Sequence, residues 1–223
     1  MDCLLSSIIF TPLLGSLAIL FIPKEKTRAV HAAALAAAGV SFLLSLLAYQ
    51  RWEPIAGMQL VERHAWIPTF HVNYYLGADG LSFPMILLTT LMTLVSLIFS
   101  LGVKERVKEY FFWFLLLDVG MLGVFASLDL VLFYVFWELT LVPMYFLIGI
   151  WGGPSKEYAA IKFFLYTLFG SVFMMLGILA LYFNAPDPTI GFDMVELAKA
   201  HPGWTESFQI WVFLAFYLGF AIK

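Results

Sequence analysis

Residues 131–151, VLFYVFWELTLVPMYFLIGIW, form an apolar run whose one charged residue, Glu138, lies near its middle. A helix needs roughly 20 apolar residues to cross a hydrocarbon core of ~30 Å. At ~1.5 Å rise per residue, Glu138 lies about 10 Å from the start of the run. A glutamate is too short to reach water from that depth. The run therefore predicts a transmembrane helix that carries a carboxylate inside the membrane.

The composition of the whole chain favours a membrane protein. Of the 223 residues, 62% are apolar and 12% are Asp, Glu, Lys or Arg, against about 25% charged residues in an average soluble domain. A soluble fold cannot cover that much apolar surface with its polar residues. The formal net charge of −3 and the absence of a basic run give no indication of a nucleic-acid partner. The single cysteine, Cys3, excludes an internal disulfide and a cysteine-ligated metal cluster.

The same length criterion predicts an all-α, polytopic transmembrane helix bundle with spans at 3–22, 29–49, 80–102, 109–127, 129–150 and 157–183. A seventh span begins near 207 and is still apolar at Lys223. Because lipid-facing backbone must stay hydrogen-bonded within a helix, we expect this helix to continue and the chain to be a fragment. The first stretch lacks preceding basic residues and a small-residue cleavage site, so we interpret it as a retained span rather than a signal peptide.

The connections carry further signals. Residues 50–79 and 184–206 are long enough to be extramembrane loops; the first is rich in Trp and Tyr, and the second contains an amphipathic stretch, 192–200. Asp79 or Ser82 is expected to cap the third helix, with Pro84 in its first turn, and Asp129 is expected to cap the fifth.

The distribution of Lys and Arg predicts the orientation. Connections 1, 3 and 5 hold seven of these residues, and connections 2, 4 and 6 hold three: Lys24, Lys26, Arg28, Lys104, Arg106, Lys108 and Lys156, against Arg51, Arg63 and Lys199. The positive-inside rule then places the odd-numbered connections in the cytoplasm and the amino terminus outside it.

Ionisable residues inside spans are costly and usually face a protein interior or a water-filled path. Glu138 fits an ion pathway, because Pro143 removes a backbone donor and crowds the carbonyl of Leu139, which loosens the helix nearby. A protonated Glu138 that only joins helices is the alternative.

Three other ionisable residues fall within spans. Lys223 follows an uncharged run, 208–222, and either reaches the boundary by its long stem or acts inside. Lys162 has the same two interpretations. Asp118 lies in the middle of a span. We favour a hydrogen bond to a neighbouring helix over a role in a proton pathway, because a buried carboxylic acid can stay neutral. The histidines show no ligand spacing, so no metal site is predicted: His31, His64, His71 and His201.

A buried carboxylate and a buried lysine together make a proton device. Burial disfavours the charged form of each, whereas an opposite charge nearby favours it. A change of three pKa units corresponds to about 4 kcal/mol, which helix movements could supply. When the two residues are close, both stay charged; when they separate, the lysine tends to lose its proton and the glutamate tends to gain one.

Several motifs in combination give a family resemblance: FWELTLVPMYFLIGIWGG (136–153), GVFASLDLVLFYV (123–135), YLGADGLS (75–82) and AAIKFFLYTLFGS (159–171). The chain resembles the antiporter-like subunits of respiratory complex I, NADH:quinone oxidoreductase, and the Val-Pro-Met-Tyr run is similar to the M-type members. The resemblance implies a fold of about fourteen helices with two inverted repeats. Residues 1–110 then hold helices 1–3 and loop 50–79, and 111–223 the first part of the first repeat.

The resemblance also implies roles. Glu138 matches an essential glutamate, Lys223 in FAIK matches an essential lysine at mid-membrane, and Lys162 matches a common lysine; Asp118 matches no motif residue. The implied function is proton translocation in the inner (plasma) membrane, with NADH, FMN, iron–sulfur clusters and quinone bound in partner subunits and none in this chain. L-type and N-type subunits would be neighbours. A multi-component cation/proton antiporter, a membrane-bound hydrogenase or a non-conducting scaffold are the alternatives.

Overall fold

A computed structural model describes residues 3–53, 57–200 and 203–223. Six helical segments are long and apolar enough to cross a membrane, and a seventh apolar helix is one residue shorter than the shortest of them. The long helices are α1 (Leu4–Phe21), α2 (Thr27–Gln50), α3 (Ser82–Phe99), α4 (Val107–Ala126), α5 (Leu130–Leu139) followed by α6 (Leu141–Trp151), α7 (Lys156–Phe183) and α9 (Glu206–Ile222). The predicted spans are therefore confirmed as helices.

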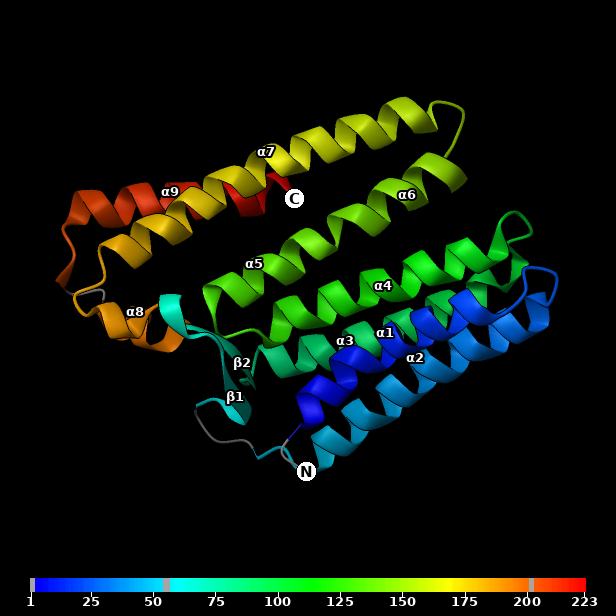
Figure 1. The fold of residues 1–223 in the computed structure, drawn as a ribbon, viewed down its shortest axis with the longest axis horizontal. Coiled ribbons are helices and arrows are strands. Elements are labelled where there is room, and N and C mark those ends of the chain that lie inside the picture. The colour runs from blue at the N-terminus through cyan, green and yellow to red at the C-terminus, as the bar shows by residue number, and fades with distance from the viewer. Residues whose placement is uncertain (1–2, 54–56, 201–202) are drawn as a thin grey trace.

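The helices run side by side, and Figure 1 shows the bundle along its length. Helices α1 to α4 pack together, α5 and α6 lie against α4, and α7 packs on α6 and α9. The turns that join α1 to α2, α3 to α4 and α6 to α7 lie at one end, and the strands and α8 (Met194–Ala200) lie at the other, which we call the hairpin end. Helix α9 starts at the hairpin end and stops midway along α7 (Figure 1).

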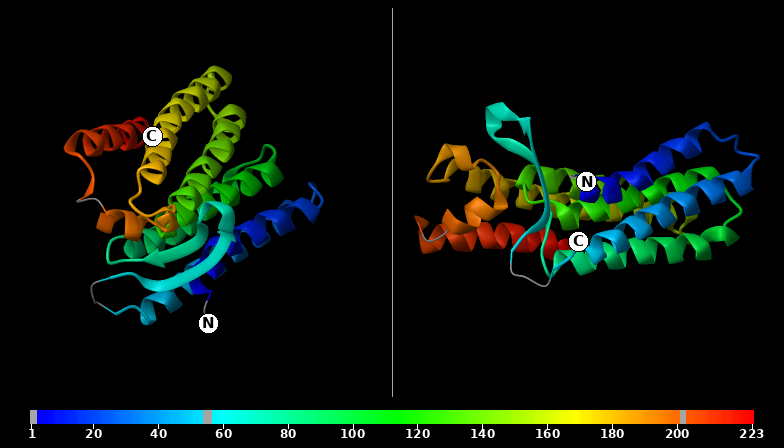
Figure 2. Two further views of the ribbon diagram at one scale, coloured as in Figure 1. Left: turned by 60° about the vertical axis from the view of Figure 1, so that its left-hand side comes forward. Right: turned by 90° about the horizontal axis from the view of Figure 1, so that it is seen from below.

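Residues 50–79 were predicted as an extramembrane loop, and the structure shows that this loop contains two strands. Strands β1 (Gln59–Ile67) and β2 (Val72–Ala78) form a two-stranded antiparallel sheet that projects from the bundle in the view from below (Figure 2). A short 3-10 turn, Pro68–Phe70, joins the strands, and His71 completes the reversal with a φ of 52°. Most residues of β1 are exposed, including the apolar Val61 and Trp66, whereas most residues of β2 are buried. The apolar residues lie on both sides of a turn of irregular length, so the sequence did not indicate the two strands.

The hairpin also caps α1. The carboxylate of Glu62 on β1 is buried and accepts hydrogen bonds from the amides of Leu5 (2.7 Å) and Ser6 (3.2 Å). The Ser6 hydroxyl donates to the same carboxylate and lies beside the hydroxyl of Tyr74 on β2. The first amides of a helix have no partner within the helix, and its positive end attracts an anion. Glu62 therefore fixes the hairpin to the start of α1, and burial raises the pKa of Tyr74 there.

The predicted cap of α3 is confirmed. Asp79 Oδ1 accepts from the amides of Leu81 (3.0 Å) and Ser82 (2.7 Å), and the Ser82 hydroxyl accepts from the Asp79 amide. These hydrogen bonds hold the pKa of Asp79 below its usual value, and the bond from the Ser82 amide has the largest effect. The 3-10 turn Ser100–Gly102 ends α3, and Pro188–Ile190 forms another before α8.

Glu62→Ala is expected to lower the free energy of unfolding by about 1–3 kcal/mol, because the amides of Leu5 and Ser6 lose a charged acceptor. Reversible unfolding of the full-length protein in mixed detergent micelles measures this. Glu53→Ala is the matched control, since that side chain is exposed. Equal losses in the two variants would contradict the capping role of Glu62.

Candidate functional site

The fifth span is divided at Thr140, where α5 ends and α6 begins. Pro143, three residues later, has no amide hydrogen to donate to Leu139. The Met144 amide reaches the Thr140 carbonyl at a long 3.3 Å, and the Thr140 hydroxyl donates to the carbonyl of Trp137 at 2.8 Å. The proline predicted in the sequence to loosen the helix thus coincides with a break in it, one residue after Leu139.

The ammonium of Lys223 lies at this break. Its Nζ donates to the Trp137 carbonyl at 2.9 Å and to the Thr140 hydroxyl at 2.7 Å, and it stands 4.3 Å from the centroid of the Trp137 ring. The carboxyl end of a helix carries partial negative charge, and an aromatic face attracts a cation. Although the residue as a whole is exposed, its ammonium therefore turns onto α5 rather than toward the boundary.

Glu138 lies between the residues that hold this lysine. Its side chain is half-buried, and its Oε1 is buried without a hydrogen-bond partner in the described part of the chain. Tyr134, one turn earlier on α5, interacts with the carboxylate. Glu138 and Lys223 interact electrostatically, but among the described residues no ion pair joins them. The structure thus brings the two residues to one helix break without direct contact.

A cleft of about 300 Å³ opens beside the ammonium. Apart from Thr140 and Lys223 its walls are apolar and come from α4 to α7: Leu117, Met121, Val124, Phe125, Trp137, Met144 and Phe163. Such a wall leaves the cation few groups to interact with besides those on α5. Trp137 is held from the other side, because its ring nitrogen donates to the Ser171 hydroxyl on α7 at 3.2 Å.

Helix α4 reaches the break because it carries glycines there. A Cβ on Gly120 would lie 2.7 Å from Cγ2 of Thr140 and 3.1 Å from the carbonyl oxygen of Phe136. A Cβ on Gly123 would overlap the Phe136 ring at 2.2 Å. Small residues let membrane helices approach closely. Gly120 and Gly123 therefore set the distance between α4 and the break, a role that was not predicted from the sequence.

The other two candidate residues lie elsewhere. Lys162 is exposed on α7, with its Nζ 5.7 Å from the centroid of the Tyr158 ring, and the structure does not bring it to Glu138. Asp118 is fully buried on α4 and accepts a hydrogen bond from Thr93 on α3 at 2.7 Å. No three His, Cys, Asp or Glu side chains of the described ranges gather in a group that could hold a metal ion; His201 lies outside those ranges.

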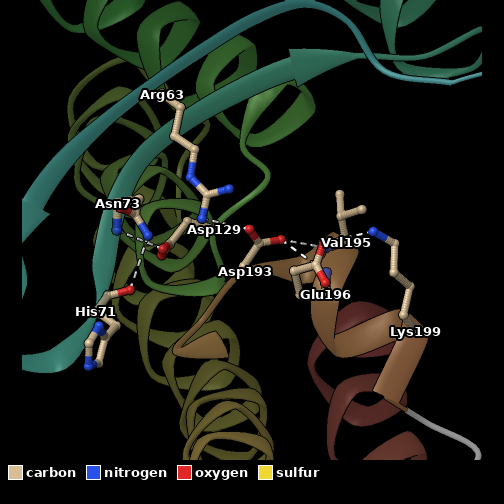
Figure 3. Close-up of polar contacts among 8 residues, drawn as sticks. All are labelled: Arg63, His71, Asn73, Asp129, Asp193, Val195, Glu196 and Lys199. Carbon is tan, nitrogen blue, oxygen red and sulfur yellow. Dashed lines mark hydrogen bonds and ion pairs between the residues drawn. The ribbon is translucent and has the colours of Figure 1, made fainter. Parts of the chain in front are cut away.

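The start of α5 is fixed at the hairpin end by the cluster in Figure 3. Asp129 Oδ1 accepts from the amides of Val131 and Leu132, which confirms the predicted cap, and Oδ2 accepts from the Asn73 amide on β2 at 2.9 Å. Burial raises the pKa of Asp129, although the three hydrogen bonds from backbone amides act to lower it.

The neighbouring acid in that cluster ties α8 to the hairpin (Figure 3). Asp193 caps α8 through the amides of Val195 and Glu196 and pairs with Arg63 of β1 at 2.9 Å. Backbone bonds between Leu130 and Phe192 and between Met194 and Leu128 join the two connections. Hairpin, α8 and the start of α5 are thus one connected unit.

Comparisons with known proteins place this arrangement in a family. Residues 127–223, which contain the break and both ends of its contact with Lys223, match the family described as "NADH:quinone oxidoreductase/Mrp antiporter, TM". NADH-quinone oxidoreductase subunit M of Rhodobacter capsulatus is 42% identical over the entire chain, which covers 46% of that relative. The chain is thus similar to these membrane subunits over its entire length.

Solved structures share this fold. Respiratory complex I from Thermus thermophilus contains a chain that matches with a TM-score of 0.82 at 29% identity, covering 98% of this chain and 43% of that one. A chain of the Mrp complex from Dietzia matches with a TM-score of 0.80 at 16% identity, over 98% of this chain and 23% of that one, and shows the shared fold alone. The chain spans about half the length of the curated relatives it matches.

Gly120→Ala is expected to lower the free energy of unfolding by about 1–3 kcal/mol, because the added methyl overpacks the contact with Thr140. Gly39→Ala is the matched control, since a Cβ there meets nothing within 4 Å and alanine favours helix by up to about 1 kcal/mol. Unfolding of the full-length protein in detergent compares them. If Gly120→Ala were as stable as Gly39→Ala, the close approach of α4 would be wrong.

Proposed function

We propose that this chain is part of a proton-translocating membrane subunit of NADH:quinone oxidoreductase, in which Glu138 and Lys223 exchange protons. The observation that carries the proposal is the ammonium of Lys223 on the open end of α5, beside a carboxylate with an unpartnered buried oxygen. The similarity to subunit M of Rhodobacter capsulatus over the entire chain supports the choice of complex.

The geometry gives the lysine two ways to be stabilised. At the break, the carbonyl of Trp137 and the hydroxyl of Thr140 accept from its ammonium. Thr140 can donate to a neutral amine if its hydroxyl turns away from the Trp137 carbonyl, to which it donates in the structure, because a hydroxyl is both donor and acceptor. A protonated and a neutral Lys223 can therefore both be held at one place, which a site that must load and unload a proton requires.

Glu138 controls which form is favoured. A negative carboxylate near the ammonium stabilises its charge, and a proton arriving on Glu138 removes that stabilisation. Because the residues are near each other without an ion pair, the coupling is electrostatic and can be changed by a small movement at the break. Proton uptake at one residue thus promotes release at the other.

In this proposal the redox cofactors and substrates of the complex are bound by partner subunits. NADH, FMN, iron–sulfur clusters and quinone would be bound by other subunits, and neighbours of the L and N types would flank this one. The hairpin end would lie outside the cytoplasm, as the distribution of Lys and Arg indicates. Lys162 is exposed on α7. It would take part in a proton path only if further residues of the full-length subunit, or other subunits, cover that face.

Glu138→Gln and Lys223→Met, each in the full-length subunit within its assembled complex, are expected to abolish most NADH-driven proton uptake by sealed vesicles. Each change removes one group that can gain and lose a proton. Electron transfer from NADH to an artificial acceptor reports that the complex is intact.

Glu109→Gln is the control, because that carboxylate is exposed and pairs with Arg106 at the end opposite the hairpin. Full proton uptake in assembled complexes that carry Glu138→Gln would show that the subunit is a non-conducting scaffold. Sodium uptake in place of proton uptake would instead favour a cation/proton antiporter.

A further inference from the structure

Asp118 has an environment unlike that of any other acid inside the described spans. Its side chain is 0% exposed, and Thr93, which donates to its Oδ1 at 2.7 Å, is 3% exposed. The second oxygen, Oδ2, is also buried and has no hydrogen-bond partner among the described residues. A fully buried carboxyl group with one donor on one oxygen needs an explanation, since buried polar atoms are nearly always paired.

The acid stands at the end of a row of hydroxyls. Thr90 lies one turn from Thr93 on the same face of α3, and its Oγ1 is 2.9 Å from the hydroxyl of Ser45 on α2. Ser45 and Thr90 are as buried as the acid. Helices α2, α3 and α4 therefore meet along a polar row inside an apolar interior, and Asp118 is its only acid.

No cation in the described part of the chain neutralises Asp118. Helices α1 and α3 and the segments α6 and β2, which pack on α4, contain no Asp, Glu, Lys, Arg or His. The other Asp, Glu, Lys, Arg and His residues of α2, of α4 itself and of α5 lie at the helix ends or at the break: Arg28, His31, Lys108, Glu109 and Glu138. An ionised carboxylate here would keep one donor and no counter-charge, which is far more costly than a buried neutral acid.

We propose that Asp118 is a second proton-binding site of this chain, a carboxylic acid that carries its proton on Oδ2 while its Oδ1 accepts from Thr93. In this form Oδ1 is the carbonyl oxygen, and the hydroxyl of Thr93 donates to it as the structure shows. The bound proton removes the net charge from the polar row.

This site is separate from the Glu138–Lys223 pair. Gly120, two residues after Asp118, contacts Thr140 at the break. Two residues turn a helix by roughly 200°, so Asp118 faces α3 on the side of α4 away from the break. The inference therefore does not depend on the proposed function, and a proton at Asp118 is stored apart from the one exchanged by Lys223.

Infrared spectroscopy tests the proposal directly. The complex containing the full-length subunit is prepared with isotope-labelled aspartate carboxyl groups, and the stretch of protonated carboxyl C=O is recorded at neutral pH. A labelled band that is present in the wild type and absent from Asp118→Asn is expected. Identical carboxylic-acid bands in the two samples would overturn the proposal, because Asp118 would then be ionised.

A second pair of variants keeps the test decisive if Asp118→Asn does not assemble. Thr93→Val removes the donor to Oδ1 and is expected to shift the band to higher frequency. Thr89→Val is the matched control, because its hydroxyl makes an exposed hydrogen bond to the Met85 carbonyl on the same helix. An unshifted band in Thr93→Val would contradict the assignment. Proton uptake by the Glu138→Gln complex tests the proposed function separately, because its outcome does not depend on the carboxylic-acid band of Asp118.

Discussion

The contact of the Lys223 ammonium with the open end of α5 is the interaction on which the site depends. A cation inside an apolar bundle must find acceptors there, because unpaired buried charge is costly. A continuous helix would offer none, since its carbonyls are occupied by amides four residues on. Pro143 and the break at Thr140 expose the Trp137 carbonyl and the Thr140 hydroxyl to the lysine. The same break places Glu138 next to it, so one irregularity in the backbone assembles the charged pair.

The rest of the structure holds that break in place from both sides. At the hairpin end, Asp129 caps α5 and is tied to β2, while Asp193 and Arg63 tie α8 to β1. At the break, Gly120 and Gly123 let α4 lie directly against Thr140 and Phe136. A short helix with both ends fixed can carry charged groups inside a membrane without sliding. The apolar cleft beside Lys223 leaves room for small movements of the lysine itself.

Much of the fold could be predicted because each span carries its own signal. Length, apolarity and caps such as Asp79 and Asp129 are local properties of the sequence, and these predictions are confirmed. The hairpin was missed because its strands pack on the ends of helices rather than in an alternating sheet core. Glu62, an ordinary loop glutamate by sequence, is buried only because the start of α1 lies above it. Long-range contacts of this kind leave no local pattern.

The candidate site was predicted in its members more than in its geometry. Glu138 stood out by depth, and Pro143 marked the break within a few residues, whereas Lys223 gained its role only through the family resemblance. Thr140 and Trp137 were not recognised, since a threonine and a backbone carbonyl carry no signal of their own. The spacing of Gly120 and Gly123 could have indicated a close helix contact. Asp118 was expected to bond to a neighbouring helix, and the bond from Thr93 confirms this.

A double-mutant cycle between Thr140→Val and Lys223→Met tests the central claim most directly. The free energy of unfolding of the full-length subunit is measured for the wild type, both single variants and the double variant. Direct contact predicts a coupling energy of about 0.5–3 kcal/mol, and the pair Thr140→Val with Lys162→Met, whose side chains lie apart, is expected to be additive. Additivity within about 0.5 kcal/mol for Thr140 and Lys223 would show that the ammonium does not rest on the break.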